Sequence, residues 1–361
     1  MLKKLTSILL VLVLVLGLSA CTKKEEPAPA PAPAEPVKAD TVYILATGGT
    51  IAGTGESGKT QGYSAGELDV QSLIDAVPGI EDLCKIKGIQ VCNTASDNVT
   101  AKEWITIANT INKLAQDPTV AGFVVTHGTD TLEETAYFLD LTVKTDKPVI
   151  VVGAMRPATA TSADGPFNLY QSVALARSEE GVGRGVMVVF SDGIYAAREV
   201  TKVTTFKTDA FSGRDMGCLG YMRDDKPYFY NISAKAHTVD TPFDVSNLED
   251  LPKVAVAYFH IDADVELLKY YMDNYDGVVV AGAGNGSSST AWSNLVKERV
   301  DGGDKTIVVR AGRMDNGIVT DSASYMQSIA ADNLNPQKAR ILLSLALTLT
   351  DDREQIREYF G

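Results

Sequence analysis

The chain has 361 residues, of which 45% are hydrophobic and 22% charged, enough for two domains with hydrophobic cores. Its net charge of −13 at pH 7 disfavours nucleic acid as a partner, because an acidic surface repels phosphate backbones. An aromatic content of 7% argues against a surface on which single-stranded bases stack, and no apolar stretch reaches the roughly 20 residues of a membrane-spanning helix.

The first forty residues are interpreted as a targeting signal and a tether. Two lysines precede an unbroken apolar run at 8–16, which leads through Leu-Ser-Ala to Cys21. This order resembles a bacterial lipoprotein signal at 1–20 with lipidation of Cys21, and the alternative is a plain secretory signal with a chance cysteine. The Pro-Ala alternation within 21–40 is typical of an extended tether. We therefore expect a periplasmic or otherwise extracytoplasmic protein that contacts the membrane only through its lipid.

From residue 41 onward, short apolar runs alternate with helical patterns, and Thr100 and Thr131 each begin a capping-box sequence. Repeated strand–loop–helix units form right-handed crossovers, so they predict an N-terminal α/β domain at 41–234 with a mostly parallel sheet flanked by helices. The expected strands are 42–46, 86–91, 122–126, 149–152 and 186–190, and the expected helices include 69–77, 100–115 and 164–176.

A connector with little periodicity is expected at 235–252, followed by a smaller C-terminal α/β domain at 253–361. Asn335 and Pro336 have the order of a helix cap and first turn, and Asp351 is expected to cap a short final helix. The predicted strands of this domain are 254–258, 277–280 and 306–309.

Three cysteines remain after Cys21, namely Cys84, Cys92 and Cys218, and an odd number cannot form a closed disulfide framework. Cys84 and Cys92 flank a Lys-Gly pair that suggests a turn, so a hairpin disulfide stays open beside the favoured interpretation of small buried cysteines. The three histidines are too scattered for a metal motif, and neither a metal nor a cofactor is expected.

Two glycine-rich segments imitate nucleotide-binding loops. Residues 53–60 fit the phosphate-loop pattern, but they begin six residues after their strand and are followed by two glycines where a helix should begin. We interpret them as part of a mobile surface loop that closes over a site. Residues 282–286 are interpreted as a tight strand-to-helix turn, because their third glycine comes one position early for a dinucleotide fingerprint.

Two threonine-rich loops, at 47–50 and 126–131, are the candidates for chemistry. Acyl transfer from an amide needs a nucleophile, a base and donors for an oxyanion, and both loops combine hydroxyls with glycines that expose backbone N–H groups. Both loops follow strand ends, where parallel sheets collect ligands. Ordinary turns with capping threonines explain the same pattern, so the residues alone leave these two interpretations open.

Long stretches of the chain resemble the bacterial type II L-asparaginases, including the periplasmic glutaminase-asparaginases. The stretches are ILATGGTIAG at 44–53, THGTDTLEETA at 126–136, GAMRP at 153–157, SADGPFNL at 162–169 and LNPQKAR at 334–340. The resemblance implies hydrolysis of the side-chain amide of asparagine through a threonine acyl-enzyme, with glutamine as a second candidate substrate. It also implies a homotetramer built as a dimer of dimers.

The resemblance further implies particular roles for residues of this chain. Thr50 corresponds to the nucleophile, Tyr63 to the tyrosine that contacts it, and Thr129, Asp130 and Lys202 to a second catalytic group. Ser96 corresponds to a serine that binds the substrate carboxylate, and Asp130 to the carboxylate that holds the α-amino group. The implied substrate-binding residues are Gly49, Ser96, Asp97, Thr129, Asp130 and Ala154.

Three positions depart from the family pattern. Asp97 stands where relatives commonly have glutamine or glutamate, Ser287 stands where some have asparagine, and 320–322 lacks a glutamate that some donate across the dimer. These departures leave the support of Tyr63 and the preference between asparagine and glutamine open. The rival from another functional class is a lipid-anchored amino-acid-binding protein, and a nucleotide hydrolase ranks third.

Overall fold

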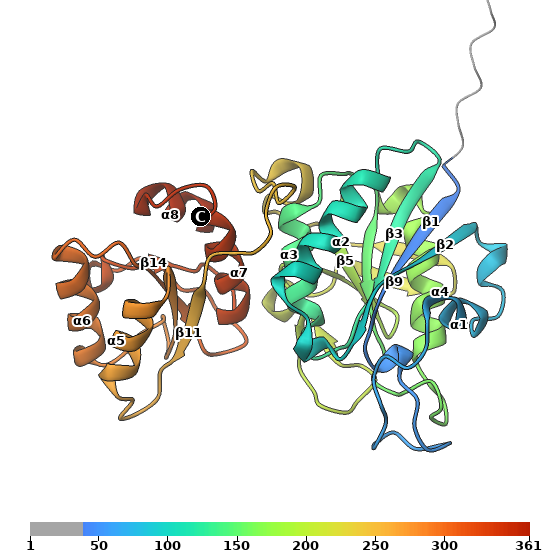
Figure 1. Cartoon of the computed structure of the whole chain (residues 1–361), viewed down its shortest axis with the longest axis horizontal. Helices are drawn as coiled ribbons and strands as arrows, with labels where there is room; N and C mark the ends of the chain where they lie inside the picture. The colour runs from blue at the N-terminus through green and yellow to red at the C-terminus, as the bar shows by residue number, and fades with distance from the viewer. Residues whose placement is uncertain (1–38) are drawn as a thin grey trace, which may run out of the picture. The chain divides into compact units, whose positions relative to one another are not determined.

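The computed structural model describes residues 39–361 (Figure 1). The predicted signal at 1–20, the lipidation of Cys21 and nearly all of the predicted tether lie outside the described residues. Among residues 39–361, no helix is long and apolar enough to cross a bilayer.

The larger sheet has eight strands in the order β10-β9-β6-β5-β4-β3-β1-β2. Strands β1 to β5 pair in parallel, whereas β6, β9 and β10 add an antiparallel extension that the sequence did not predict. The prediction of a mostly parallel sheet is confirmed. The strands are β1 (Thr41–Gly48), β2 (Lys85–Thr94), β3 (Val120–Thr126), β4 (Val149–Val152), β5 (Val186–Phe190), β6 (Gly193–Ala196), β9 (Gly220–Arg223) and β10 (Lys226–Phe229).

Helices cover both faces of this sheet, as predicted: α1 (Val70–Asp75) and α4 (Gly165–Ala176) on one, α2 (Ala101–Leu114) and α3 (Leu132–Thr142) on the other (Figure 1). Neighbouring residues of β3 show the cause. Phe123 and Val125 are buried with Trp104 of α2, while Val124 is buried in the opposite core with Val173 of α4. Successive side chains of a strand point to opposite faces, so a sheet buried on both faces needs a continuous apolar run.

The two predicted capping boxes have different outcomes. At α2 the box is confirmed, because the Thr100 backbone N–H donates to the Glu103 carboxylate at 2.8 Å and the Thr100 hydroxyl accepts from the first turn. At α3 the box is wrong. The Thr131 hydroxyl donates instead to the carbonyl of Ser96 at 2.8 Å and makes no capping bond. A contact with a distant loop therefore replaces the local cap.

The C-terminal part has a parallel four-stranded sheet in the order β11-β12-β13-β14. Asn335 caps α7 by accepting the Lys338 N–H at 3.1 Å, with Pro336 at the first turn, as predicted. The last helix is capped by Asp352, and the predicted cap at Asp351 is wrong. The elements are β11 (Val254–Tyr258), α5 (Val265–Asn274), β12 (Gly277–Gly282), α6 (Thr290–Asp301), β13 (Ile307–Gly312), β14 (Ile329–Ala330), α7 (Pro336–Ala346) and α8 (Arg353–Phe360).

Helix α7 connects the two sheets. Its residues Ile341 and Leu345 are fully buried and belong to the same apolar core as Phe138 of α3 and Val279 of β12. A separate small ribbon, β7 (Thr201–Lys202) paired with β8 (Phe211–Ser212), lies in the long loop after β6.

The hairpin considered for Cys84 and Cys92 is wrong. Strand β2 runs without a break through Lys87 and Gly88, and all three described cysteines are unpaired. They are half-buried, so the prediction of buried cysteines is also wrong. Eight residues of extended strand separate the two cysteines by about 26 Å, whereas a disulfide requires Cα atoms within about 7 Å.

Asp140 of α3 supplies a pH test of the fold. Burial raises its pKa to about 6, although His237, Arg198 and Lys338 oppose the rise, and its Oδ1 accepts the Val186 N–H at 2.8 Å. The folded-state pKa of Asp140 lies above the ordinary value of 3.8. The contribution of the protonated carboxyl group to folding stability is therefore complete below about pH 4 and is lost as pH rises through 6.

We therefore expect Asp140→Asn to increase the free energy of unfolding by about 1–3 kcal/mol at pH 8 and by much less at pH 4.5. Urea unfolding of both proteins at the two pH values measures the difference. An equal effect at both pH values would contradict the assignment.

Candidate active site

The two threonine-rich loops meet at one edge of the larger sheet. They follow the neighbouring parallel strands β1 and β3, and the Thr47 hydroxyl donates to the carbonyl of Thr126 at 2.8 Å. Gly49 has φ +79°, and a Cβ atom there would lie 2.3 Å from the backbone nitrogen of Gly128. Only glycine fits such a backbone contact, so this pair of glycines brings Thr50 and Thr129 to the same edge.

Tyr63 contacts Thr50 directly. The Thr50 Oγ1 and Tyr63 Oη atoms are 2.7 Å apart, and Thr50 is only 8% exposed at the start of a short 3-10 turn (Thr50–Ala52). Tyr63 is carried by the glycine-rich loop, which folds back on itself through backbone bonds between Thr54 and Ser64. No helix follows 53–60, so the segment lacks the helix N-terminus that a phosphate loop requires.

A second polar group lies on the other loop. The Lys202 Nζ donates to the Thr129 hydroxyl at 2.8 Å and to the Asp130 carboxylate at 2.6 Å. The lysine side chain is 17% exposed, whereas that of Asp130 is 77% exposed. Lys202 is thus held inside while Asp130 offers its free oxygen to solvent or ligand. Lys202 reaches this place because the β7–β8 ribbon carries it there.

Ser96 and Ala154 lie beside these loops. Ser96 is buried in a short turn after β2, and a Cβ atom at Gly128 would lie 2.7 Å from its hydroxyl. Ala154 is buried just after β4, next to Gly153, where an added Cβ would lie 3.1 Å from the Thr129 side chain. Asp97 is exposed beside Ser96. The structure thus gathers the sequence-predicted residues at one sheet edge: Gly49, Thr50, Tyr63, Ser96, Asp97, Thr129, Asp130, Ala154 and Lys202.

His127 orients the second loop, a role that sequence reasoning missed. It is fully buried, with Nδ1 2.9 Å from the Gly128 carbonyl and Nε2 2.9 Å from the Thr135 hydroxyl. A carbonyl can only accept, so Nδ1 carries the hydrogen and Thr135 donates to Nε2. Burial lowers the pKa of His127 to about 4, so the ring is neutral near pH 7.

This bond fixes the peptide between Gly128 and Thr129. Because N–H and C=O point in opposite directions across a trans peptide, the Thr129 N–H is turned away from His127. The signal in the sequence was a histidine inside the threonine loop, but its partner Thr135 lies on α3 and only the fold shows the contact.

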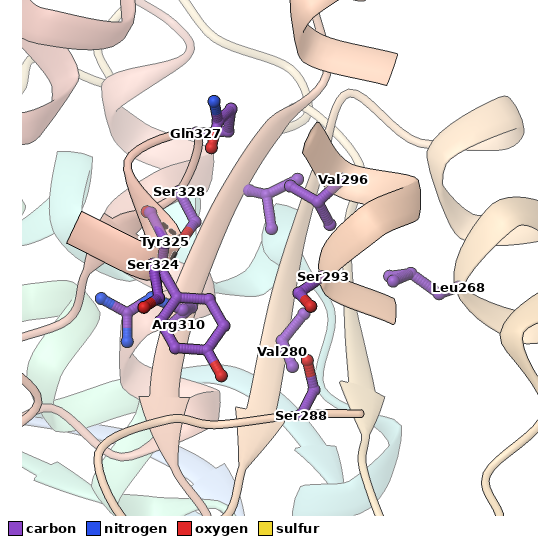
Figure 2. A pocket seen from close by; sticks show the side chains of 11 residues that line it. Leu268, Val280, Ser288, Ser293, Val296, Arg310, Ser324, Tyr325, Gln327 and Ser328 are labelled. Atoms are coloured by element: carbon purple, nitrogen blue, oxygen red, sulfur yellow. Dashed lines mark hydrogen bonds between the residues drawn. The ribbon is translucent and has the colours of Figure 1, made fainter. Parts of the chain in front are cut away.

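A pocket in the C-terminal part is lined by none of these residues (Figure 2). Arg310 of β13 is buried there, with its guanidinium 4.6 Å from the centroid of the Tyr325 ring. It donates to Ser328 Oγ at 2.9 Å and to the carbonyls of Asn285 and Thr320 at 2.7 and 3.1 Å. These bonds tie neighbouring loops together.

No group of three or more His, Cys, Asp or Glu side chains suited to a metal ion occurs within residues 39–361. The polar groups at the sheet edge are hydroxyls, one lysine and two carboxylates, Asp97 and Asp130. Such a set supports nucleophilic attack and proton transfer.

Two family models match the chain. "Asparaginase, N-terminal" matches residues 41–235, and "Glutaminase/Asparaginase C-terminal domain" matches 253–360. The chain therefore belongs to the asparaginase family and is an amidohydrolase, which confirms the resemblance found in the sequence. The two-domain α/β fold expected of this class is confirmed as well.

Similar proteins agree with this assignment. L-asparaginase 2 of Bacillus subtilis is 48% identical, with 89% of this chain and 86% of that protein covered. Glutaminase-asparaginase of Acinetobacter glutaminasificans is 43% identical, with 89% and 99% covered. The crystal structure of a probable cytoplasmic L-asparaginase from Campylobacter jejuni has a TM-score of 0.85 and 48% identity, with 89% and 99% covered.

The predicted periplasmic, lipid-anchored location is contradicted by these comparisons. The solved relative from Campylobacter jejuni is described as cytoplasmic, while a relative from Haemophilus influenzae at 44% identity is described as periplasmic. None of these similarities points to a lipid anchor. The prediction rested on the first forty residues alone. The α/β domains that these relatives share occur in proteins of both locations, so the domains do not indicate a cellular location.

Proposed function

We propose that this chain hydrolyses the side-chain amide of free L-asparagine to aspartate and ammonia, with Thr50 as the nucleophile. The observation that carries the proposal is the 2.7 Å contact between Thr50 and Tyr63, at the same sheet edge as the contacts of Lys202 with Thr129 and Asp130. A buried hydroxyl paired with a second proton-carrying group is what nucleophilic catalysis by threonine requires.

In the first step, Thr50 Oγ1 bonds to the amide carbon. Its proton passes to the Tyr63 hydroxyl, whose own proton goes to the amide nitrogen as the C–N bond breaks and ammonia leaves. Within residues 39–361, the backbone N–H groups of Thr50 and Thr129 donate to no acceptor. They are therefore available to stabilise the oxyanion that forms during attack.

In the second step, a water oxygen bonds to the acyl carbon, the ester bond to Thr50 breaks, and the water proton returns to Thr50 Oγ1. Lys202 donates to the Thr129 oxygen, so the Thr129 proton is directed elsewhere and serves to orient the water. The acyl-enzyme splits one difficult hydrolysis into two easier displacements.

Two further groups explain why a free amino acid fits. The exposed oxygen of Asp130 binds the α-ammonium group, and the buried hydroxyl of Ser96 binds the α-carboxylate. Gly49 and Ala154 approach the substrate through their backbones. Asp97 also contacts the substrate, and its side chain is shorter than that of the glutamine that relatives commonly have at this position. A peptide lacks both free termini and is expected to bind poorly.

Glutamine is the second candidate substrate, since one relative is named glutaminase-asparaginase. We also propose that the chain assembles as a homotetramer. Its catalytic domain is residues 41–234, followed by a connector at 235–252 and a C-terminal domain at 253–361.

The amino-acid-binding protein is the rival function. It is disfavoured because binding alone requires no hydroxyl–tyrosine pair.

Steady-state titrations with asparagine and glutamine test the function. We expect saturable ammonia release from asparagine, and the ratio of the two kcat/KM values measures the preference. Saturable binding of asparagine by calorimetry without ammonia release would favour the binding protein.

Thr50→Ala tests the nucleophile. We expect ammonia release to fall by more than about 10³-fold while asparagine binding is retained, because the hydroxyl takes part in bond formation. Thr54→Ala is the matched control, since Thr54 forms hydrogen bonds within residues 39–361 only through its backbone. Near-normal turnover in Thr50→Ala would overturn the assignment.

Lys202→Met tests the second catalytic group. We expect kcat to fall by about 10²–10⁴-fold, as for loss of a proton-transfer group, while Lys207→Met on the same loop stays near wild type. Lys207 is exposed, and within residues 39–361 its side chain makes no hydrogen bond or ion pair. A loss below tenfold in Lys202→Met would assign the lysine a structural role.

A further inference from the structure

Glu133 is a buried carboxylate next to the site that the mechanism above does not use. It lies in the first turn of α3, four residues after Thr129, and is 4% exposed. Its Oε2 accepts the backbone N–H of Lys202 at 2.7 Å. Glu133 therefore holds the backbone from which the lysine side chain extends toward Thr129.

The other oxygen of Glu133 is held by the C-terminal part of the chain. Oε1 accepts from Asn335 Nδ2 at 2.9 Å and from Gln337 Nε2 at 2.7 Å. The Asn335 Oδ1 is already engaged by the Lys338 N–H as the cap of α7. The amide of Asn335 therefore cannot turn over without losing the cap, and its nitrogen must face Glu133.

Lys338 holds the segment that leads to Lys202. Its ammonium is fully buried and donates to the carbonyls of Ala197 and Arg198 at 2.9 and 3.0 Å, and also to that of Val200. Burial opposes charge on both partners, yet the nearby Lys338 lowers the pKa of Glu133, so the carboxylate is ionised. Three side chains at the start of α7 thus secure 197–202 directly or through Glu133.

We propose that Asn335, Gln337 and Lys338, together with Glu133, are positioning residues that set Lys202 against Thr129. The C-terminal domain thereby affects the rate of a reaction whose reacting groups all come from the N-terminal domain. The inference rests on the proposed role of Lys202. A displacement of about 1 Å in a reacting group is enough to cost about 10²-fold in rate. The buried hydrogen bond that holds the backbone of Lys202 therefore affects catalysis.

Gln337→Met tests the proposal, because it removes one donor to Glu133 and keeps an unbranched side chain of similar length. We expect kcat for asparagine to fall about 3–30-fold with KM within about twofold of wild type, since substrate contacts are not altered. Gln337→Leu is a second variant with the same expectation, in case one substitution fails to fold.

Arg340→Gln is the matched control on the same helix. Arg340 pairs with Glu134 at 3.6 Å and lies over the Trp104 ring, so its loss also removes an interdomain contact but leaves Glu133 and Lys202 untouched. We expect an unchanged kcat and a lower melting temperature. If the contacts of Glu133 with α7 only stabilise the fold, Gln337→Met will behave like this control, with an unchanged kcat and a lower melting temperature. That result would overturn the proposal.

A double-mutant cycle separates this proposal from the proposed function. In a Lys202→Met background, Gln337→Met should not lower the residual rate further, because no lysine remains to be positioned. An equal fold-loss in both backgrounds would overturn the positioning role while the catalytic role of Lys202 stands. If Lys202→Met alone were nearly as active as wild type, the proposed role of Lys202 would fail, and the positioning role with it.

Discussion

The close approach of two backbones, Gly49 against Gly128, is the constraint on which the site depends. Strands β1 and β3 are parallel neighbours, so their following loops end at the same sheet edge. A Cβ atom at Gly49 would lie 2.3 Å from Gly128, and any larger residue would push the loops apart. The two hydroxyl groups that the proposed mechanism needs therefore come together only because neither loop carries a side chain at the contact.

Buried and partly buried hydrogen bonds hold the loops in this arrangement. Thr47 bonds to the other loop, Thr131 bonds to Ser96, and His127 fixes the Gly128 carbonyl. A buried polar group left without a partner costs about 1–3 kcal/mol, so each bond strongly disfavours other loop conformations. The result is a preorganised arrangement at the ends of rigid strands, with Tyr63 held 2.7 Å from Thr50.

The two parts of the chain are joined by more than apolar packing. Helix α7 shares a hydrophobic core with α3, and residues 39–361 belong to one compact unit. At the start of α7, buried polar side chains reach Glu133 and the segment before Lys202. Buried charges are costly unless they are paired and hydrogen-bonded. Such a network therefore specifies one packing geometry between the two domains, whereas a purely apolar interface would allow several geometries.

The sequence by itself determined the elements whose signals are local. The apolar runs of β1, β3, β4 and β5, the capping box at Thr100 and the Asn335–Pro336 helix start depend on residues a few positions apart, and the family motifs indicated the site residues. The short antiparallel strands β6, β9 and β10 carry too few residues for a periodic signal. Only the tertiary structure decided that Thr131 bonds to Ser96, that β2 continues through Gly88, and that Glu133 meets Asn335. These outcomes depend on groups distant in sequence competing for the same donors and acceptors, and chain folding alone brings those groups together.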